Sequence, residues 1–148
     1  MMYLSGRLAF GVPCKSDSCG LWNISKEEYL DDNLFKLRDS DESPFKNWGI
    51  EQNKLVPYRY VGTVPVANHV RAYVDMLYDF KFDELDGLFF DAIDSASCRS
   101  DIFMLVYGKL RNLAVFSEIN KFMVKEFGNA WISYIDAVGK VADKQAVK

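Results

Sequence analysis

The residues best suited to metal binding or nucleophilic catalysis in this sequence are three cysteines and one histidine. Cys14 and Cys19 are separated by four residues, a spacing at which two thiolates can bind one zinc ion. A closed zinc site needs two more ligands, and only Cys98 and His69 are left to supply them. Because free cysteine is commonly buried as a small apolar residue, we expect three free thiols and no metal centre.

Catalysis by a nucleophile and a histidine base would have to use His69. This residue stands beside Asn68 in an apolar stretch without a partner motif, which favours a packing role. The sequence contains no GxxxxGK[ST], GxGxxG, GxSxG or HExxH motif, so phosphate-loop, dinucleotide, hydrolase and zincin chemistry have no support. We therefore expect no catalytic or cofactor-binding residues and a protein that is not an enzyme.

Acidic residues are concentrated in the middle of the chain. Residues 75–101 carry eight acids and two bases, whereas residues 102–148 carry seven bases and four acids. Asp83, Glu84 and Asp86 lie mostly opposite the apolar positions of a helical pattern, so they are expected on a solvated helix face. Such a face can attract a basic partner by long-range electrostatics.

Four aromatic residues stand among polar neighbours in a predicted loop and edge-strand region: Phe45, Trp48, Tyr58 and Tyr60. One interpretation is that they cover one face of a small sheet. The other is that they bind a partner, because tryptophan and tyrosine are enriched among the residues that carry most of the binding energy of protein interfaces. Together with the acidic segment, these aromatics favour a protein-binding function. Our predicted partner-binding residues are Phe45, Trp48, Tyr58, Tyr60, Asp83, Glu84 and Asp86.

The composition predicts one ordinary globular domain of 148 residues with a net charge of −3. An acidic chain without a run of lysine or arginine has little attraction for phosphates, so nucleic acid is not the expected partner. No window reaches the run of about 18 apolar residues that spans a bilayer. An odd number of cysteines is typical of a reducing compartment, which indicates a cytoplasmic protein that does not bind membranes.

The spacing of breakers and apolar residues predicts an α+β fold. Glycine and proline interrupt residues 1–65, which should form a small N-terminal β-sheet region, whereas residues 66–143 show helical periodicity and should form a layer of four or five helices. Residues 144–148 are expected to fray. We do not divide residues 1–148 into separate domains.

Local signals also predict several helix boundaries. Ser25 and Glu28 have the spacing of a capping box, so a helix should begin at Lys26, with Leu30, Leu34 and Leu37 on its inner face. Apolar spacing predicts a continuous helix over residues 85–93, and Ser100 or Asp101 should cap the next helix. Gly128 should end the predicted helix that carries Phe122, Met123 and Phe127.

Three segments in order resemble a known family. Residues 4–11 read LSGRLAFG, residues 21–24 read LWNI, and a strand rich in tyrosine and valine leads into VPVANHVRAYVDMLY at 64–78. They resemble the C-terminal sensor domain of abortive-infection-type antitoxins, in which a Gly-x-Ala-Leu helix precedes a small sheet and a strand leads into an Arg-Ala-x-x-Asp-Leu-Leu helix. The resemblance covers residues 4–90. It implies an α+β domain that neutralises a protein, such as a nucleotidyltransferase-like toxin.

The family's operator-binding winged helix has no counterpart ahead of residue 4, so the resemblance does not imply autoregulation. We predict a non-catalytic cytoplasmic protein-binding module that is antitoxin-like or inhibitor-like and neutralises or scaffolds a protein partner. One alternative is a small enzyme that uses the acidic helix 83–94 with Arg71 or His69. A second alternative is a regulatory nucleic-acid-binding protein that uses the basic C-terminal segment.

Overall fold

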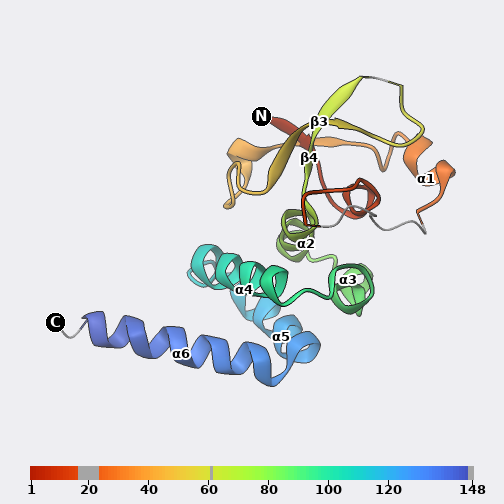
Figure 1. The fold of residues 1–148 in the computed structure, drawn as a ribbon. Coiled ribbons are helices and arrows are strands. Elements are labelled where there is room, and N and C mark those ends of the chain that lie inside the picture. The colour runs from red at the N-terminus through yellow and green to blue at the C-terminus, as the bar shows by residue number, and fades with distance from the viewer. Residues whose placement is uncertain (17–23, 61, 147–148) are drawn as a thin grey trace.

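The N-terminal half is built around a four-stranded sheet (Figure 1). The computed structural model describes residues 1–16, 24–60 and 62–146. The strands are β1 (Met2–Leu4), β2 (Leu37–Asp39), β3 (Ile50–Leu55) and β4 (Thr63–Ala67), and their order in the sheet is β2-β1-β4-β3. The central strands β1 and β4 are parallel, and both edge strands are antiparallel to their neighbours. This sheet and the helices that follow confirm the predicted α+β class.

A proline lies in the central strand β4, where it would normally remove a ladder hydrogen bond. Pro65 stands opposite a register shift between Glu51 and Lys54 of β3, which is a bulge. The strand on its other side, β1, pairs with β4 only at Leu4 and Val66. Neither β1 nor β3 needs a hydrogen bond from the backbone nitrogen of Pro65, so β4 continues through this residue. The strand ends at Ala67, two residues beyond the end of the strand-rich part that the sequence predicted.

Short helical turns connect the strands: a 3₁₀ turn (Arg7–Gly11), α1 (Lys26–Leu30) and a second 3₁₀ turn (Ser40–Glu42). The capping box predicted at Ser25 is confirmed, with the Glu28 N–H donating to Ser25 Oγ and the Ser25 N–H donating to the Glu28 carboxylate. The predicted inner face is wrong. The helix ends at Leu30, and Leu30, Leu34 and Leu37 are 47%, 50% and 37% exposed.

The C-terminal half consists of helices. They are α2 (His69–Tyr78), α3 (Phe82–Leu85), a π-helical turn (Phe89–Ile93), α4 (Ala96–Leu110), α5 (Phe116–Phe127) and α6 (Asn129–Ala146). The continuous helix predicted over 85–93 is interrupted at Gly87, where φ is +76°. Ser95 caps α4, in place of the predicted Ser100 or Asp101. As predicted, α5 ends at Gly128, but α6 continues through residues 144–146, which were expected to fray.

Helix α2 lies between the sheet and the other helices (Figure 1). All nine residues from His69 to Leu77 are buried, because one side of α2 contacts β4 and the other contacts α4. A helix surrounded in this way needs internal partners for each polar side chain it carries. Those partners form the centre of the candidate site.

An aromatic cluster joins α2 to the helices below it. The ring centres of Phe103 and Phe127 are 5.1 Å apart, and those of Phe103 and Trp131 are 5.2 Å apart, both with edge-to-face geometry. Phe89 and Tyr73 also contact Phe127, at 5.2 and 6.3 Å. Edge-to-face pairs add about 0.5–1.5 kcal/mol to the burial of their surfaces, so this cluster fixes the helices against one another.

Candidate functional site

A buried ion pair within α2 holds the N-terminal half together. Arg71 and Asp75 are both fully buried, and Arg71 Nε donates to Asp75 Oδ1 at 3.0 Å. The other four N–H groups of the guanidinium donate to Lys46 O (2.7 Å), Trp48 O (2.6 Å), Tyr3 Oη (2.9 Å) and Ser43 Oγ (3.0 Å). Because all five donors are used, Arg71 is a structural hub that links β1, the segment before β3, and α2.

The second oxygen of Asp75 connects this hub to the surface. Asp75 Oδ2 accepts hydrogen bonds from Tyr3 Oη at 2.7 Å and Ser5 Oγ at 2.6 Å. Burial, followed by the charge of Asp75, raises the pKa of Tyr3 well above its usual value, so the phenol stays a donor at all ordinary pH values. Ser5 gives its proton to Asp75 and therefore offers only lone pairs to a ligand.

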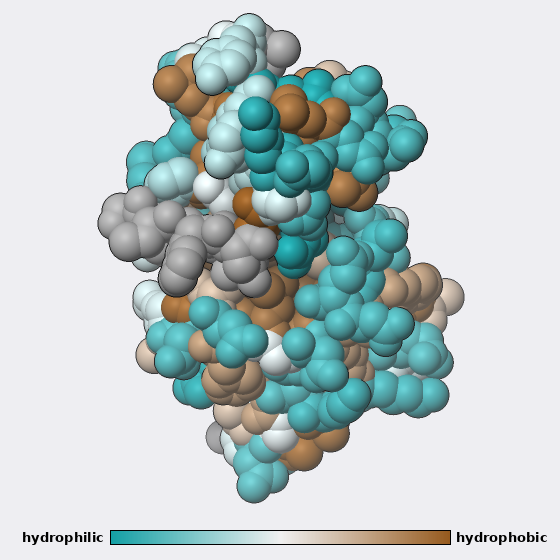
Figure 2. Space-filling view, turned by 90° about the vertical axis from the view of Figure 1, so that its right-hand side faces the viewer, coloured by the Kyte–Doolittle hydropathy of each residue, from teal (hydrophilic) through white to brown (hydrophobic). Residues whose placement is uncertain are grey.

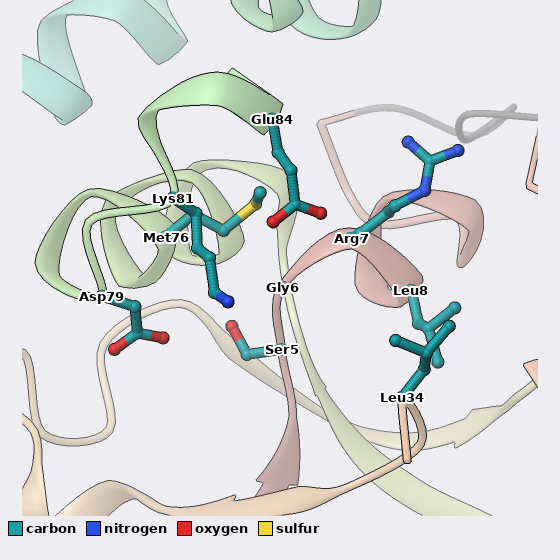
Figure 3. A pocket seen from close by; sticks show the side chains of 9 residues that line it. All are labelled: Ser5, Gly6, Arg7, Leu8, Leu34, Met76, Asp79, Lys81 and Glu84. Atoms are coloured by element: carbon teal, nitrogen blue, oxygen red, sulfur yellow. The ribbon is translucent and has the colours of Figure 1, made fainter. Parts of the chain in front are cut away.

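Ser5 lies on the wall of a pocket of about 170 Å³ (Figure 3). Residues 5–8 form one wall, Met76 and Asp79 at the end of α2 form a second, and Leu34, Lys81 and Glu84 complete the lining. Gly6 has φ +73° and ψ −154°, a conformation that only glycine adopts without strain, although a Cβ there would meet open space. Glycine is required here by the backbone conformation of the turn, and not by a neighbouring group that a side chain would meet.

Four charged side chains line the pocket, and two of them form ion pairs with residues outside its lining. Arg7 Nε donates to Glu28 at 2.7 Å, and the Asp79 carboxylate accepts two bonds from Arg38, at 2.6 and 3.2 Å. Lys81 and Glu84 project over the pocket in Figure 3, and neither has an ion pair within the described part of the chain. The pocket therefore presents one cation, one anion and an accepting hydroxyl beside apolar walls, which suits a small zwitterionic group.

Arg71, which the enzyme alternative would combine with the acidic segment, is fully buried. All five of its donors bind groups outside residues 83–94. Of the acidic residues that we predicted as binding residues, Glu84 lines the pocket; Asp83 and Asp86 are exposed beside it.

The four predicted aromatics do not form one surface. Phe45 is only 2% exposed and faces the Arg71 guanidinium at 5.5 Å, so it belongs to the core. Trp48 is partly buried, and its carbonyl binds the same guanidinium before β3 begins. Tyr58 and Tyr60 follow the other end of β3, about 20 Å along a six-residue strand. Phe45 therefore lies in the core, whereas Tyr58 and Tyr60 are exposed.

The end of β3 and the connection to β4 carry the two most exposed large apolar side chains of the described residues, Tyr60 and Leu55, together with Tyr58. Tyr60 is 99% exposed, Leu55 is 71% exposed and Tyr58 is 48% exposed. We call these three residues the hairpin tip. Sequence reasoning missed Leu55, although its position at the end of an edge strand was a usable signal.

Arg59 anchors the hairpin tip to the segment around α1. Its Nε donates to Tyr29 O and its Nη2 to Asp32 Oδ1, both at 2.8 Å. Its guanidinium lies 4.2 Å from the centre of the Phe35 ring. The Tyr58 and Tyr29 ring centres are 6.1 Å apart. Four side-chain contacts thus tie Tyr58 and Arg59 to the segment around α1.

Helix α3 lies on the same side of the molecule as the β3–β4 connection. In Figure 1 the β3–β4 connection, α1 and α3 are all toward the right. Figure 2 faces this side and shows a mainly hydrophilic surface with separate hydrophobic patches. Asp83 and Glu84 of α3, and Asp86 directly after it, are exposed.

Of the three cysteines and the histidine that could do chemistry, the structure describes Cys14, Cys98 and His69. Cys14 and Cys98 are buried free thiols, and Cys19 lies outside the described residues. Among the described residues, no group of three or more histidine, cysteine or acidic side chains could hold a metal ion. His69 is buried beside Phe10, with ring centres 5.4 Å apart.

No protein-family model, curated protein or solved structure matches this chain. Among the described helices, none combines the length and apolar composition that a membrane crossing requires.

Proposed function

We propose that this chain is a non-catalytic protein-binding module that docks a basic protein through the hairpin tip. The observation that carries the proposal is the exposure of Leu55, Tyr58 and Tyr60 on one anchored loop. Scattered exposed apolar residues are normal, but two tyrosines grouped on one anchored segment are typical of interfaces, because tyrosine is enriched among the residues that carry binding energy.

The order of the loop favours binding because little freedom remains to be lost. Val56 is buried at 3% exposure and Arg59 is held by two hydrogen bonds, so the backbone is fixed on both sides of Tyr58. Tyr58 has φ +64°, a left-handed conformation that costs a non-glycine residue about 1 kcal/mol or more. The packed neighbours maintain that strain, and a preorganised loop loses less entropy on association.

Charge indicates the chemistry of the partner. Asp83, Glu84 and Asp86 are exposed, and helix α3 lies on the same side as the β3–β4 connection (Figure 1). The Asp32 side chain, which pairs with Arg59, is 90% exposed. We propose a partner whose basic surface surrounds an apolar recess for Tyr60. Within this class we propose an antitoxin-like or inhibitor-like role in the cytoplasm, with a nucleotidyltransferase-like toxin as partner; the resemblance of residues 4–90 supports this specific form.

Site-specific photo-crosslinking tests the proposal. The chain is expressed in its native host with Tyr60→p-benzoylphenylalanine, and Met104→p-benzoylphenylalanine is the control, since Met104 is 48% exposed on α4. We expect a basic protein to be captured at position 60 and not at position 104. With the purified partner, Tyr60→Ala should weaken binding by about 2 kcal/mol or more through faster dissociation, and Met104→Ala should change it little.

Equal capture at both positions, or a purified partner that Tyr60→Ala binds normally, would refute the proposal. Capture of nucleic acid at position 104 alone would favour the nucleic-acid alternative. The variant Asp83→Asn/Glu84→Gln/Asp86→Asn should slow association, and the effect should fade as salt rises, because exposed charges are screened over about 8–10 Å. A slower association that persists at high salt would contradict a steering role for these carboxylates.

A further inference from the structure

The Ser5 side of the pocket in Figure 3 is suited to a ligand group that donates hydrogen bonds. Ser5 Oγ gives its own proton to Asp75 Oδ2 at 2.6 Å, and the buried Asp75 is held in turn by Arg71. A hydroxyl whose proton is already used presents only its lone pairs. The pocket also lies at the C-terminal end of α2, where the helix dipole is negative. Both features favour a cationic N–H donor beside Ser5.

Glu84 and Lys81 bring one charge of each sign to the same opening. In Figure 3 the Glu84 carboxylate and the Lys81 ammonium both point into the space above Ser5. The two side chains are three residues apart but do not pair with each other, and neither has another ion-pair partner among the described residues. The pocket therefore offers an anion to a ligand ammonium and, next to it, a cation to a ligand carboxylate.

The opposite wall of the pocket is apolar. Leu8 and Leu34 lie side by side across the pocket from Lys81 (Figure 3), and Met76 is also part of the lining. Leu8 and Met76 are each 3% exposed, whereas Leu34 is 50% exposed and leaves apolar surface that a ligand can cover. The volume of about 170 Å³ lies below the range of roughly 300–1,000 Å³ that holds drug-sized ligands. The occupant should be small and should carry a short aliphatic group.

We propose that this pocket binds a free α-amino acid with an aliphatic side chain about the size of valine or leucine. Its ammonium lies between Ser5 Oγ and the Glu84 carboxylate, its carboxylate faces Lys81, and its side chain covers Leu34. An α-amino acid carries both charges on one carbon, which matches two opposite charges at one small opening. A residue within a peptide chain has neither charge and does not fit this arrangement. The site uses none of the residues of the hairpin tip.

Titration of the isotope-labelled full chain with L-leucine tests the proposal, with backbone amide signals followed by NMR. We expect a Kd of roughly 0.1–1 mM, as is typical of a ligand this small in a partly open site. The signals that shift should be those of residues 5–8 and 79–85. Glycine should bind at least about fivefold more weakly, because it has no side chain to cover the apolar wall.

Two analogues of leucine each lack one charge, and two variants remove the matching partners. Isoamylamine lacks the carboxylate and 4-methylpentanoate lacks the ammonium, so each should bind about fivefold more weakly than L-leucine, the upper end for an exposed ion pair. Lys81→Met should weaken L-leucine by a similar factor and leave isoamylamine unchanged. Glu84→Gln should weaken both. All these side chains are exposed, so the fold should persist, and Lys109→Met on α4, outside the pocket, is the matched control.

Three results would overturn the proposal. The first is that L-leucine, at about ten times the expected Kd, shifts no signal of the residues that line the pocket. The second is that isoamylamine binds as tightly as L-leucine, since the pocket would then be a site for simple cations. The third is that Lys81→Met changes the affinity for L-leucine no more than Lys109→Met does. The titration uses no protein partner, so its outcome is independent of the proposed role of the hairpin tip.

Discussion

Replacing Arg71 by methionine should destabilise the protein more than any other single loss of charge. The variant leaves the buried carboxylate of Asp75 without its cation, and it leaves the carbonyls of Lys46 and Trp48 without their donors. Removing one partner of a buried ion pair costs about 3–5 kcal/mol, and each buried carbonyl left unpaired adds about 1–3 kcal/mol. Relaxation recovers part of this sum, so we expect a loss of about 4 kcal/mol or more.

Such a loss is a large part of the roughly 5–15 kcal/mol that stabilises a typical domain. It corresponds to a fall in Tm of roughly 8–16 °C for a chain of this size. Urea unfolding followed by tryptophan fluorescence and circular dichroism measures it. The matched control is Arg38→Met, because Arg38 forms a bidentate pair with Asp79 in which the two side chains are 30% and 37% exposed. Exposed pairs contribute about 1 kcal/mol or less.

The double variant Arg71→Met/Asp75→Leu distinguishes charge from hydrogen bonding. It removes both charges but still leaves the two carbonyls unpaired, so its loss should be about 2–4 kcal/mol, well below the sum of the two single variants. If Arg71→Met lowers the free energy of unfolding no more than Arg38→Met does, our account of Arg71 as the hub of the N-terminal half is refuted. Strict additivity in the double variant would refute the charge component.

Three further outcomes follow from packing and ionisation. Phe89→Ala should cost about 3–5 kcal/mol in denaturant unfolding, because the ring is buried at 2% exposure against Phe127; a loss below 1 kcal/mol would contradict this. Burial, followed by the charge of Glu28, raises the pKa of Tyr29 from 10 to about 12. The protonated phenol is thus favoured in the folded state, and stability should be full below pH 10 and fall toward pH 12, less steeply in Tyr29→Phe. Gly11→Ala should destabilise the protein because the new methyl group would overlap the Tyr29 hydroxyl, and Tyr29→Phe should relieve much of that loss in a double-mutant cycle.

Local signals in the sequence were sufficient where a boundary depends on neighbouring residues. The capping box at Ser25 and the helix end at Gly128 are both decided within four residues of chain, and both predictions are confirmed. The leucines at 30, 34 and 37 show the limit of this reasoning. Their spacing fits a helix, but the capping residue Asp31 is extended, with φ −80° and ψ 113°, and the three side chains remain exposed.

The candidate site was harder to predict because its partners are distant in the sequence. A charged residue such as Arg71 is usually exposed, and nothing beside it indicates that acceptors from residues 3, 43, 46 and 48 will surround it. The same hub has Phe45 beside it in the core, a contact that the neighbouring residues do not indicate. Tyr60 was predictable because no such long-range partner competes for it.

The place of β1 in the sheet has a consequence for how the chain folds during synthesis. Of the four strands this one is made first, yet its neighbours are β2, which begins at Leu37, and β4, which ends at Ala67. The sheet can therefore close only after nearly half of the 148 residues exist, and closing such long loops slows folding. Contacts between α5 and α6, in contrast, join neighbouring segments. The half of the protein made first depends on distant partners, and the half made last can assemble from local ones.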